Sequence, residues 1–170
     1  LMMCFDLGGP VNKAAYLFAT AGLSTGDESS MQIMAAVMAS GMVAPIALSL
    51  ATFIRKSLFT PAEQENGKSA WLLGLSFVSE GAIPFAAADP FRVIPSMMAG
   101  GAVTGAISMA LSVGSRAPHG GVFVFFAIDP FWGYLVAIAA GVVVSTAAVL
   151  AMKQFWPNKA VEEAAQNVAA

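Results

Sequence analysis

Three long stretches of this chain contain no Asp, Glu, Lys or Arg. They are Met31–Ile54, Val93–Ser115 and Phe131–Met152. Each one is long enough to cross the hydrocarbon core of a bilayer as a helix, which needs about 20 residues. A buried helix of a soluble protein rarely stays uncharged over such a length. The sequence therefore predicts an all-α membrane protein with transmembrane helices.

Composition supports this prediction and excludes several classes of protein. Hydrophobic residues make up 58% of the chain and charged residues only 11%, whereas soluble domains are about 25% charged. The net charge of −2 and the lack of a basic patch exclude nucleic acid as a partner. With a single cysteine, Cys4, and a single histidine, no metal site is predicted, and no cofactor motif is present. We interpret Cys4 as a small buried apolar residue.

Two further apolar stretches are short and broken. Ser69–Ala88 is interrupted by Glu80, by a glycine and by Pro84, and Ala117–Ile128 contains a Pro-His-Gly-Gly sequence. Irregular backbone at membrane depth is tolerated only where protein or a watery cavity surrounds it. In transporters, such broken segments are the best pointer in a sequence to the binding site.

The basic residues predict the orientation of the chain. Two basic regions, after the first and the last long stretch, should face the cytoplasm. The chain must then cross an even number of times between them, and Val93–Ser115 and Phe131–Met152 already satisfy this. The two broken stretches are therefore predicted to be re-entrant hairpins. The basic residues are Arg55, Lys56, Lys68, Lys153 and Lys159, and the opposite side carries Asp27 and Glu28.

Local signals predict where several helices start and pack. Asp89-Pro90 and Asp129-Pro130 each place an N-cap aspartate before a proline suited to the first helical position. Thr60–Glu63 has the spacing of a capping box and should open a short polar helix. Gly101–Gly105 is a Gly-x-x-x-Gly sequence, which predicts close helix packing.

Glu80 is the first candidate for a functional side chain. A carboxylate in an apolar segment must meet a cation, hydroxyl groups or water, because its desolvation is costly. One interpretation is a structural ion pair with Arg92 or Lys13. The other is a ligand contact, in which Glu80 accepts hydrogen bonds from sugar hydroxyls or acts as a base toward one.

Other polar residues lie in similar surroundings. His119 stands between Pro118 and a Gly-Gly pair; a neutral imidazole has one donor and one acceptor, which suits an uncharged polyol. Asn12 should lie in the first turn of a helix that restarts after Gly-Gly-Pro, with its amide toward a cavity. Lys13 either reaches the membrane surface or supports the site, and Asp6 could pair with it.

Asp89 and Arg92 are further candidates for supporting the site. We interpret Asp89 mainly as a helix N-cap. A cation in the first turn opposes the helix dipole, so Arg92 is predicted to have another task, such as ion pairing or contact with phosphate.

Four segments together resemble the membrane (IIC) domain of bacterial fructose-type sugar phosphotransferase permeases. They occur in the same order and with similar spacing over roughly the first 150 residues. The segments are Asp6–Ala15, Ser79–Ala87 with Asp89-Pro90 after it, Arg92–Pro95 and Ala117–Gly121.

The resemblance implies a function and a set of partners. IIC domains of this family bind a sugar outside the cell and carry it across the membrane, and a IIB domain phosphorylates it from a phosphocysteine. IIB is charged by IIA and by the histidine phosphocarrier protein, with phosphoenolpyruvate as the ultimate donor. Fructose and fructose 1-phosphate are the usual substrate and product. By motif position, the family's sugar-binding glutamate and histidine correspond to Glu80 and His119. The resemblance also implies a sugar-binding role for Asn12, with weaker support from the motif.

The chain departs from the family in length. A complete IIC domain is about twice as long, and neither its first half, which forms the homodimer interface in related families, nor a IIB domain is present. We therefore expect residues 1–154 to be the sugar-binding C-terminal half of the domain and residues 155–170 a cytoplasmic tail. Alone, this half is not expected to complete transport. Two alternatives stay open: a proton-coupled secondary transporter, with Glu80 carrying the proton, and a truncated fragment without transport activity.

Overall fold

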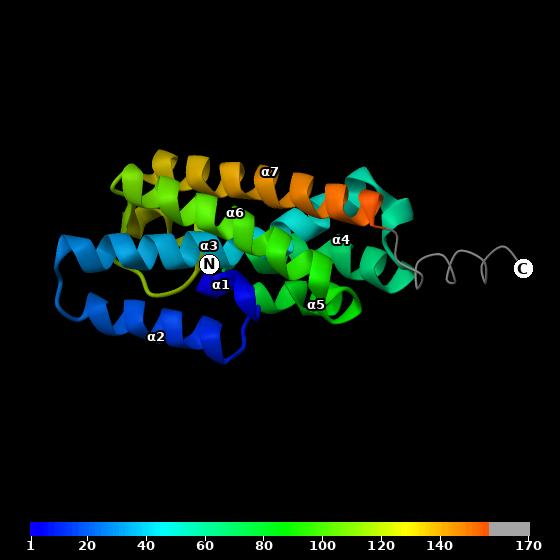
Figure 1. Ribbon diagram of the computed structural model, residues 1–170. Coiled ribbons are helices and arrows are strands. Elements are labelled where there is room, and N and C mark those ends of the chain that lie inside the picture. Colours follow the sequence, from blue (N-terminus) through cyan, green and yellow to red (C-terminus); the bar gives the residue numbers. More distant parts are fainter. Residues whose placement is uncertain (157–170) are drawn as a thin grey trace, which may run out of the picture.

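Three long helices form the centre of the protein. The computed structural model describes residues 1–156, in which α3 (Glu28–Ile54), α6 (Pro90–Ala110) and α7 (Phe131–Phe155) lie side by side (Figure 1). All three are long and apolar enough to cross a membrane. The predicted helical membrane fold is confirmed, with the second helix ending earlier than the uncharged stretch from which it was predicted.

Shorter elements surround these three helices. In Figure 1, α2 runs beside the first part of α3, and α4 and α5 lie toward the opposite end of the molecule. Two strands of two residues each pair antiparallel. The elements are α1 (Met2–Phe5), α2 (Pro10–Leu23), η1 (Lys56–Leu58), α4 (Pro61–Leu75), η2 (Ser79–Ala82), α5 (Ile83–Ala88), β1 (Gly114–Ser115), η3 (Gly121–Ala127) and β2 (Ile128–Asp129).

Small residues bring the long helices close together on two faces of α6. On one face, the carbonyl of Gly101 accepts a hydrogen bond of 3.0 Å from the Ser40 hydroxyl of α3, as the Gly-x-x-x-Gly sequence predicts. On the other, Gly100 and Thr104 contact α7 at Gly141: a Cβ built on Gly141 would lie 2.7 Å from the Gly100 carbonyl oxygen. This second contact was not predicted from the sequence.

One of three predicted helix starts is confirmed in full. Thr60 and Glu63 form the capping box, and the Glu63 carboxylate accepts from the Thr60 amide at 2.8 Å. The N-cap role predicted for Asp129 is wrong, because its backbone pairs with β1 and α7 begins two residues later, at Phe131. Asp89 does precede α6, but its side chain makes no capping hydrogen bond.

The first broken stretch folds back on itself as a helical hairpin. We call residues 61–88 the hairpin: it consists of α4, a reversal at Phe77 and the returning η2 and α5. The side-chain amide of Asn66 on α4 donates to the Gly81 carbonyl of the returning arm at 2.9 Å. The second stretch leaves and returns through the paired strands β1 and β2. That either stretch is re-entrant in a bilayer stays a prediction.

The two basic regions predicted to face the same side lie at one end of the molecule. Arg55, after α3, donates to the Gln154 side chain at the end of α7 at 2.6 Å. Asp27, which caps α3, lies at the opposite end of that helix. Lys159 and nearly all of the predicted tail fall outside the described residues, so the boundary after residue 154 stays a prediction.

Candidate functional site

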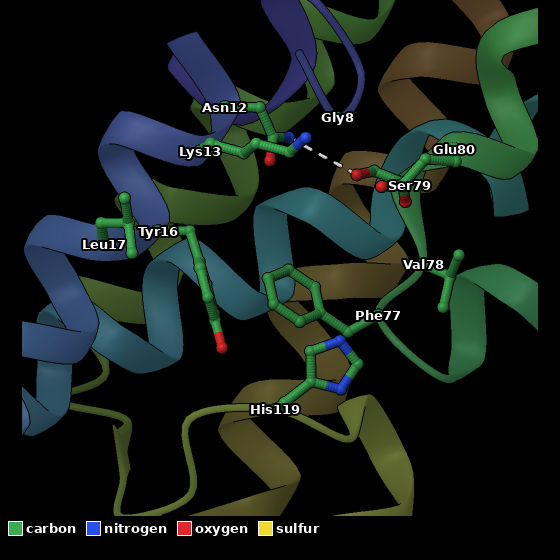
Figure 2. Close-up of a pocket in the computed structure, with 10 residues that line it drawn as sticks. All are labelled: Gly8, Asn12, Lys13, Tyr16, Leu17, Phe77, Val78, Ser79, Glu80 and His119. Carbon is green, nitrogen blue, oxygen red and sulfur yellow. Dashed lines mark hydrogen bonds between the residues drawn. The ribbon is translucent and has the colours of Figure 1, made fainter. Parts of the chain in front are cut away.

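A cleft of about 550 Å³ brings together four of the side chains predicted from the sequence. Glu80, His119, Asn12 and Lys13 all line it, although they come from three separate segments of the chain. In Figure 2, Asn12, Lys13, Ser79 and Glu80 lie toward one side of the cleft, and the rings of Tyr16, Phe77 and His119 lie toward the other. The complete lining is Gly8, Asn12, Lys13, Tyr16, Leu17, Phe77, Val78, Ser79, Glu80 and His119.

Asp6 holds the helix that supplies one wall of the cleft. Its carboxylate accepts hydrogen bonds from the backbone amides of Val11 at 2.6 Å and Asn12 at 2.9 Å. It thereby satisfies two amide groups that every helix start leaves unpaired. Asp6 does not line the cleft, and the predicted pair with Lys13 is wrong, because its oxygens are committed to the start of α2.

Asn12 joins that helix to two neighbouring segments. Its buried side-chain amide donates to the Met3 carbonyl at 2.7 Å and approaches the Ser79 hydroxyl at 3.5 Å (Figure 2). Ser79 is next to Glu80 at the start of the returning arm of the hairpin. Asn12 therefore fixes the position of η2 relative to α2, in addition to lining the cleft.

Glu80 is exposed to the cleft, with no ion pair in the described part of the chain. Lys13 lines the same cleft but lies outside the 4.0 Å limit of an ion pair with it, and Arg92 pairs with Asp89 instead. The structural alternative predicted for Glu80 is therefore not formed among these residues. Gly8 approaches the carboxylate so closely that a Cβ there would lie 2.9 Å from Glu80 Oε1.

His119 meets the tip of the hairpin. Its exposed ring lies 5.2 Å from the Phe77 ring and edge-on to the Tyr16 ring at 6.5 Å, centroid to centroid. Gly121, with φ of +60°, passes so close to the end of α4 that a Cβ would lie 2.9 Å from the Leu75 carbonyl carbon. Only glycine fits both the conformation and the space. The Pro-His-Gly-Gly loop is thus pressed against the hairpin tip.

Two aromatic residues of the cleft were not predicted from the sequence. The ring centroids of Tyr16 and Phe77 are 5.9 Å apart, and the two rings form one wall of the cleft together with the His119 ring. Phe77 adopts the left-handed conformation, with φ of +64°, which costs a non-glycine residue roughly 1–2 kcal/mol. No sequence signal marks this conformation, because phenylalanine is a usual residue of apolar segments.

Asp89 and Arg92, predicted to support the site, do not line the cleft. Arg92 Nη1 donates to Asp89 Oδ2 at 2.8 Å, and both side chains are almost fully buried. Two more buried charges, Glu63 and Lys153, complete a cluster with them. The ion pairing predicted for Arg92 is thus present, at a place separate from the cleft.

Comparison with known proteins identifies relatives. The chain is 55% identical over 156 residues to the fructose-specific EIIB'BC component of the PTS system of Escherichia coli K12, covering 90% of this chain and 27% of that protein. It is 53% identical over 163 residues to the component of the same name from Vibrio cholerae, covering 94% and 28%. It is 48% identical over 166 residues to the fructose-specific EIIC component of Haloferax volcanii, covering 98% and 43%.

The resemblance found in the motifs is confirmed. The relatives at about this level of identity are fructose-specific components of the phosphotransferase system, as the four segments predicted. The chain spans about a quarter of the length of the first two relatives and less than half of the third. No family model matches it, and no solved structure matches it.

Proposed function

We propose that this chain is the sugar-binding part of a fructose-type phosphotransferase permease, which moves a sugar across the membrane and phosphorylates it. The observation that carries the proposal is the cleft, because it unites Glu80, His119 and Asn12 from three of the segments that carry the resemblance. Its volume of about 550 Å³ falls within the usual range of small-molecule sites, about 300–1,000 Å³.

The lining of the cleft suits a neutral sugar. The Glu80 carboxylate can accept hydrogen bonds from two hydroxyl groups, and the His119 imidazole can donate one and accept one. The rings of Tyr16 and Phe77 offer an apolar wall for the C–H faces of the sugar. We propose fructose as the sugar because the relatives are fructose-specific components.

The phosphoryl group comes from elsewhere in this proposal. A phosphocysteine of a IIB domain, charged through IIA and the histidine phosphocarrier protein, gives its phosphoryl group to a sugar hydroxyl: the S–P bond breaks and an O–P bond forms. The cysteine leaves as a thiolate, and the hydroxyl proton goes either to Glu80 or, where Glu80 only orients the hydroxyl, to that thiolate. The proposal also includes fructose 1-phosphate as product, a homodimer formed through the other half of the IIC domain, the bacterial cytoplasmic membrane as location, and a cytoplasmic C-terminus.

The test is Glu80→Gln in the complete permease. We expect sugar uptake and phosphoenolpyruvate-dependent phosphorylation to be abolished, since the amide has lost one of the two acceptor oxygens and the negative charge, and cannot take a proton. Glu65→Gln is the matched control, because Glu65 is an exposed carboxylate on the same hairpin. Normal activity of Glu80→Gln would refute the role. Uptake that collapses with the proton gradient and ignores phosphoenolpyruvate would instead favour a secondary transporter.

His119→Ala tests whether His119 contacts the sugar. One hydrogen bond contributes roughly 0.5–1.5 kcal/mol, so the Kd for the sugar should rise by about two- to tenfold. Measurement of sugar binding to the purified permease gives this value. An unchanged Kd would assign His119 a structural role against Phe77 and Tyr16.

A further inference from the structure

Four charged side chains are buried together, away from the cleft. Glu63, Asp89, Arg92 and Lys153 each expose less than a tenth of their side chains. Two are acidic and two are basic, so the cluster as a whole is neutral. Buried charges are stable only when they are paired and hydrogen-bonded.

Lys153 lies between the two ends of the hairpin. Its Nζ is 3.0 Å from Glu63 Oε1, in the first turn of α4, and 3.6 Å from Asp89 Oδ2, directly after α5. The same Nζ lies 4.3 Å from the centre of the Phe59 ring. One ammonium group from α7 therefore contacts a residue in the first turn of the hairpin and the residue that directly follows the hairpin.

Each of these carboxylates is also tied to its own segment. Glu63 accepts with its other oxygen from the Thr60 amide at 2.8 Å, and Asp89 accepts from Arg92 at 2.8 Å. Movement of the ammonium away from Glu63 would leave that buried carboxylate without its cation, whereas Asp89 would keep Arg92. The base of the hairpin is consequently fixed to α7 at two points.

The hairpin connects the buried charges at its two ends to Glu80 in the cleft. Glu80 belongs to its returning arm, which Asn66 ties to α4 at Gly81, the next residue. From Ile83 the arm continues as α5 to the Asp89 end. The position of the Glu80 carboxylate thus depends on how the two ends of the hairpin are held together.

We propose that Lys153 is a positioning residue for the sugar site: by joining Glu63 to Asp89 it sets the place of Glu80 in the cleft. This inference rests on the proposed function insofar as Glu80 contacts the sugar. Binding sites hold their geometry within about 0.5 Å, and a misplacement of about 1 Å can cost as much as a hundredfold in rate. Release of the hairpin base should therefore weaken sugar binding without any change in the lining of the cleft.

The experiment compares Lys153→Met with Lys153→Met/Glu63→Gln in the complete permease. The single variant leaves a carboxylate uncompensated and should lower the yield of folded protein. The double variant restores charge balance, so we expect its abundance and Tm to recover while its sugar Kd stays raised by about tenfold. If the pair were merely structural, charge balance would restore the Kd as well. A wild-type Kd in the double variant would overturn the inference.

A second readout does not depend on sugar. Spin labels on cysteines introduced at Ser69 on α4 and Ala87 on α5 report the separation of the two arms, in a complete permease whose other cysteines, Cys4 and the IIB phosphocysteine included, are replaced by serine. We expect a broadened distance distribution in the double variant. Lys68→Met/Glu65→Gln is the control, because that pair joins the same residue types at 2.5 Å on the same hairpin but is mostly exposed. It should change neither the label distances nor the Kd.

The outcomes separate this inference from the proposed function. Loss of binding in Glu80→Gln together with wild-type binding and label distances in the double variant would overturn the inference alone. Normal uptake and phosphorylation in Glu80→Gln would overturn the role of Glu80 in the proposed function, and the label distances would still decide whether Lys153 holds the hairpin. If the double variant does not fold, Glu63→Gln alone removes one of the two contacts of Lys153, and a wild-type Kd there would overturn the inference.

Discussion

Gly8→Ala should weaken sugar binding through a residue that carries no functional group. Gly8 has a φ of +110°, and a Cβ there would lie 2.9 Å from Glu80 Oε1 and 3.0 Å from Cδ and Cγ. Ordinary van der Waals contact begins at 3.4 Å. The added methyl group must therefore displace the Glu80 carboxylate by about 0.5 Å, because Glu80 is a flexible and exposed side chain whereas Gly8 is backbone.

Two effects of this substitution can be given magnitudes. The backbone at Gly8 is strained for any other residue, at a cost of roughly 1–3 kcal/mol of stability. The displacement of Glu80 equals the tolerance of about 0.5 Å within which a binding site must hold its groups. We therefore expect the sugar Kd to rise by about tenfold, well beyond what the strain alone would do to a protein that stays folded.

Gly26→Ala separates the two effects. Gly26 has a φ of +71°, and nothing lies within 4 Å of a Cβ built there. It should lower stability by roughly 1–2 kcal/mol and leave sugar binding unchanged. Tm and sugar Kd of both variants, measured on the purified complete permease, give the comparison. A Gly8→Ala variant with lowered Tm and a wild-type Kd would refute the reasoning that the position of Glu80 controls binding.

Two further predictions concern the scaffold. Gly141→Ala should lower the free energy of unfolding by roughly 1–3 kcal/mol, because its Cβ would meet the Gly100 carbonyl and Thr104; Gly105→Ala, with its Cβ 3.3 Å from the Ser40 hydroxyl oxygen, should cost less, and equal Tm values would contradict this. Hydrogen bonds from the Thr25 hydroxyl and the Ser30 amide lower the pKa of Asp27 in the folded protein. The contribution of the Asp27 cap to the stability of α3 is therefore fully present above the ordinary aspartate pKa of about 3.9. It is lost as the pH falls through the lower pKa of the folded state. The protection factor of the Ser30 amide against hydrogen exchange should fall only in that acidic range, and Asp27→Asn should remove this pH dependence of the protection factor.

Much of the fold could be predicted because it depends on local patterns. Uncharged length alone placed α3, α6 and α7, and residue spacing placed the capping box at Thr60. The N-cap prediction failed at Asp129, since an aspartate before proline suits a strand as well as a helix start. Only the pairing of β1 with β2, a contact between distant residues, decided between these two outcomes.

The candidate site could be predicted only where polar residues stood out from apolar surroundings. Glu80, His119 and Asn12 stood out in this way, and all three line the cleft. Tyr16 and Phe77 did not, because aromatic residues are common in membrane helices. The partner of Glu63 could not be found either: Lys153 is 90 residues away, and its basic charge near the end of a span was already explained by membrane orientation.

The contrast between Glu80 and Glu63 sharpens the rule that a charge in an apolar segment indicates function. Glu63 is the buried carboxylate, and it is fully committed: Lys153 and the Thr60 amide take its two oxygens. Glu80 lies in the more apolar sequence, yet it is exposed to a cleft and forms no ion pair among the described residues. An ionised carboxylate that its own protein does not satisfy keeps its acceptor sites for a ligand. The committed pair at the base of the hairpin and the uncommitted carboxylate near its tip are therefore complementary, because the first can hold the second in place.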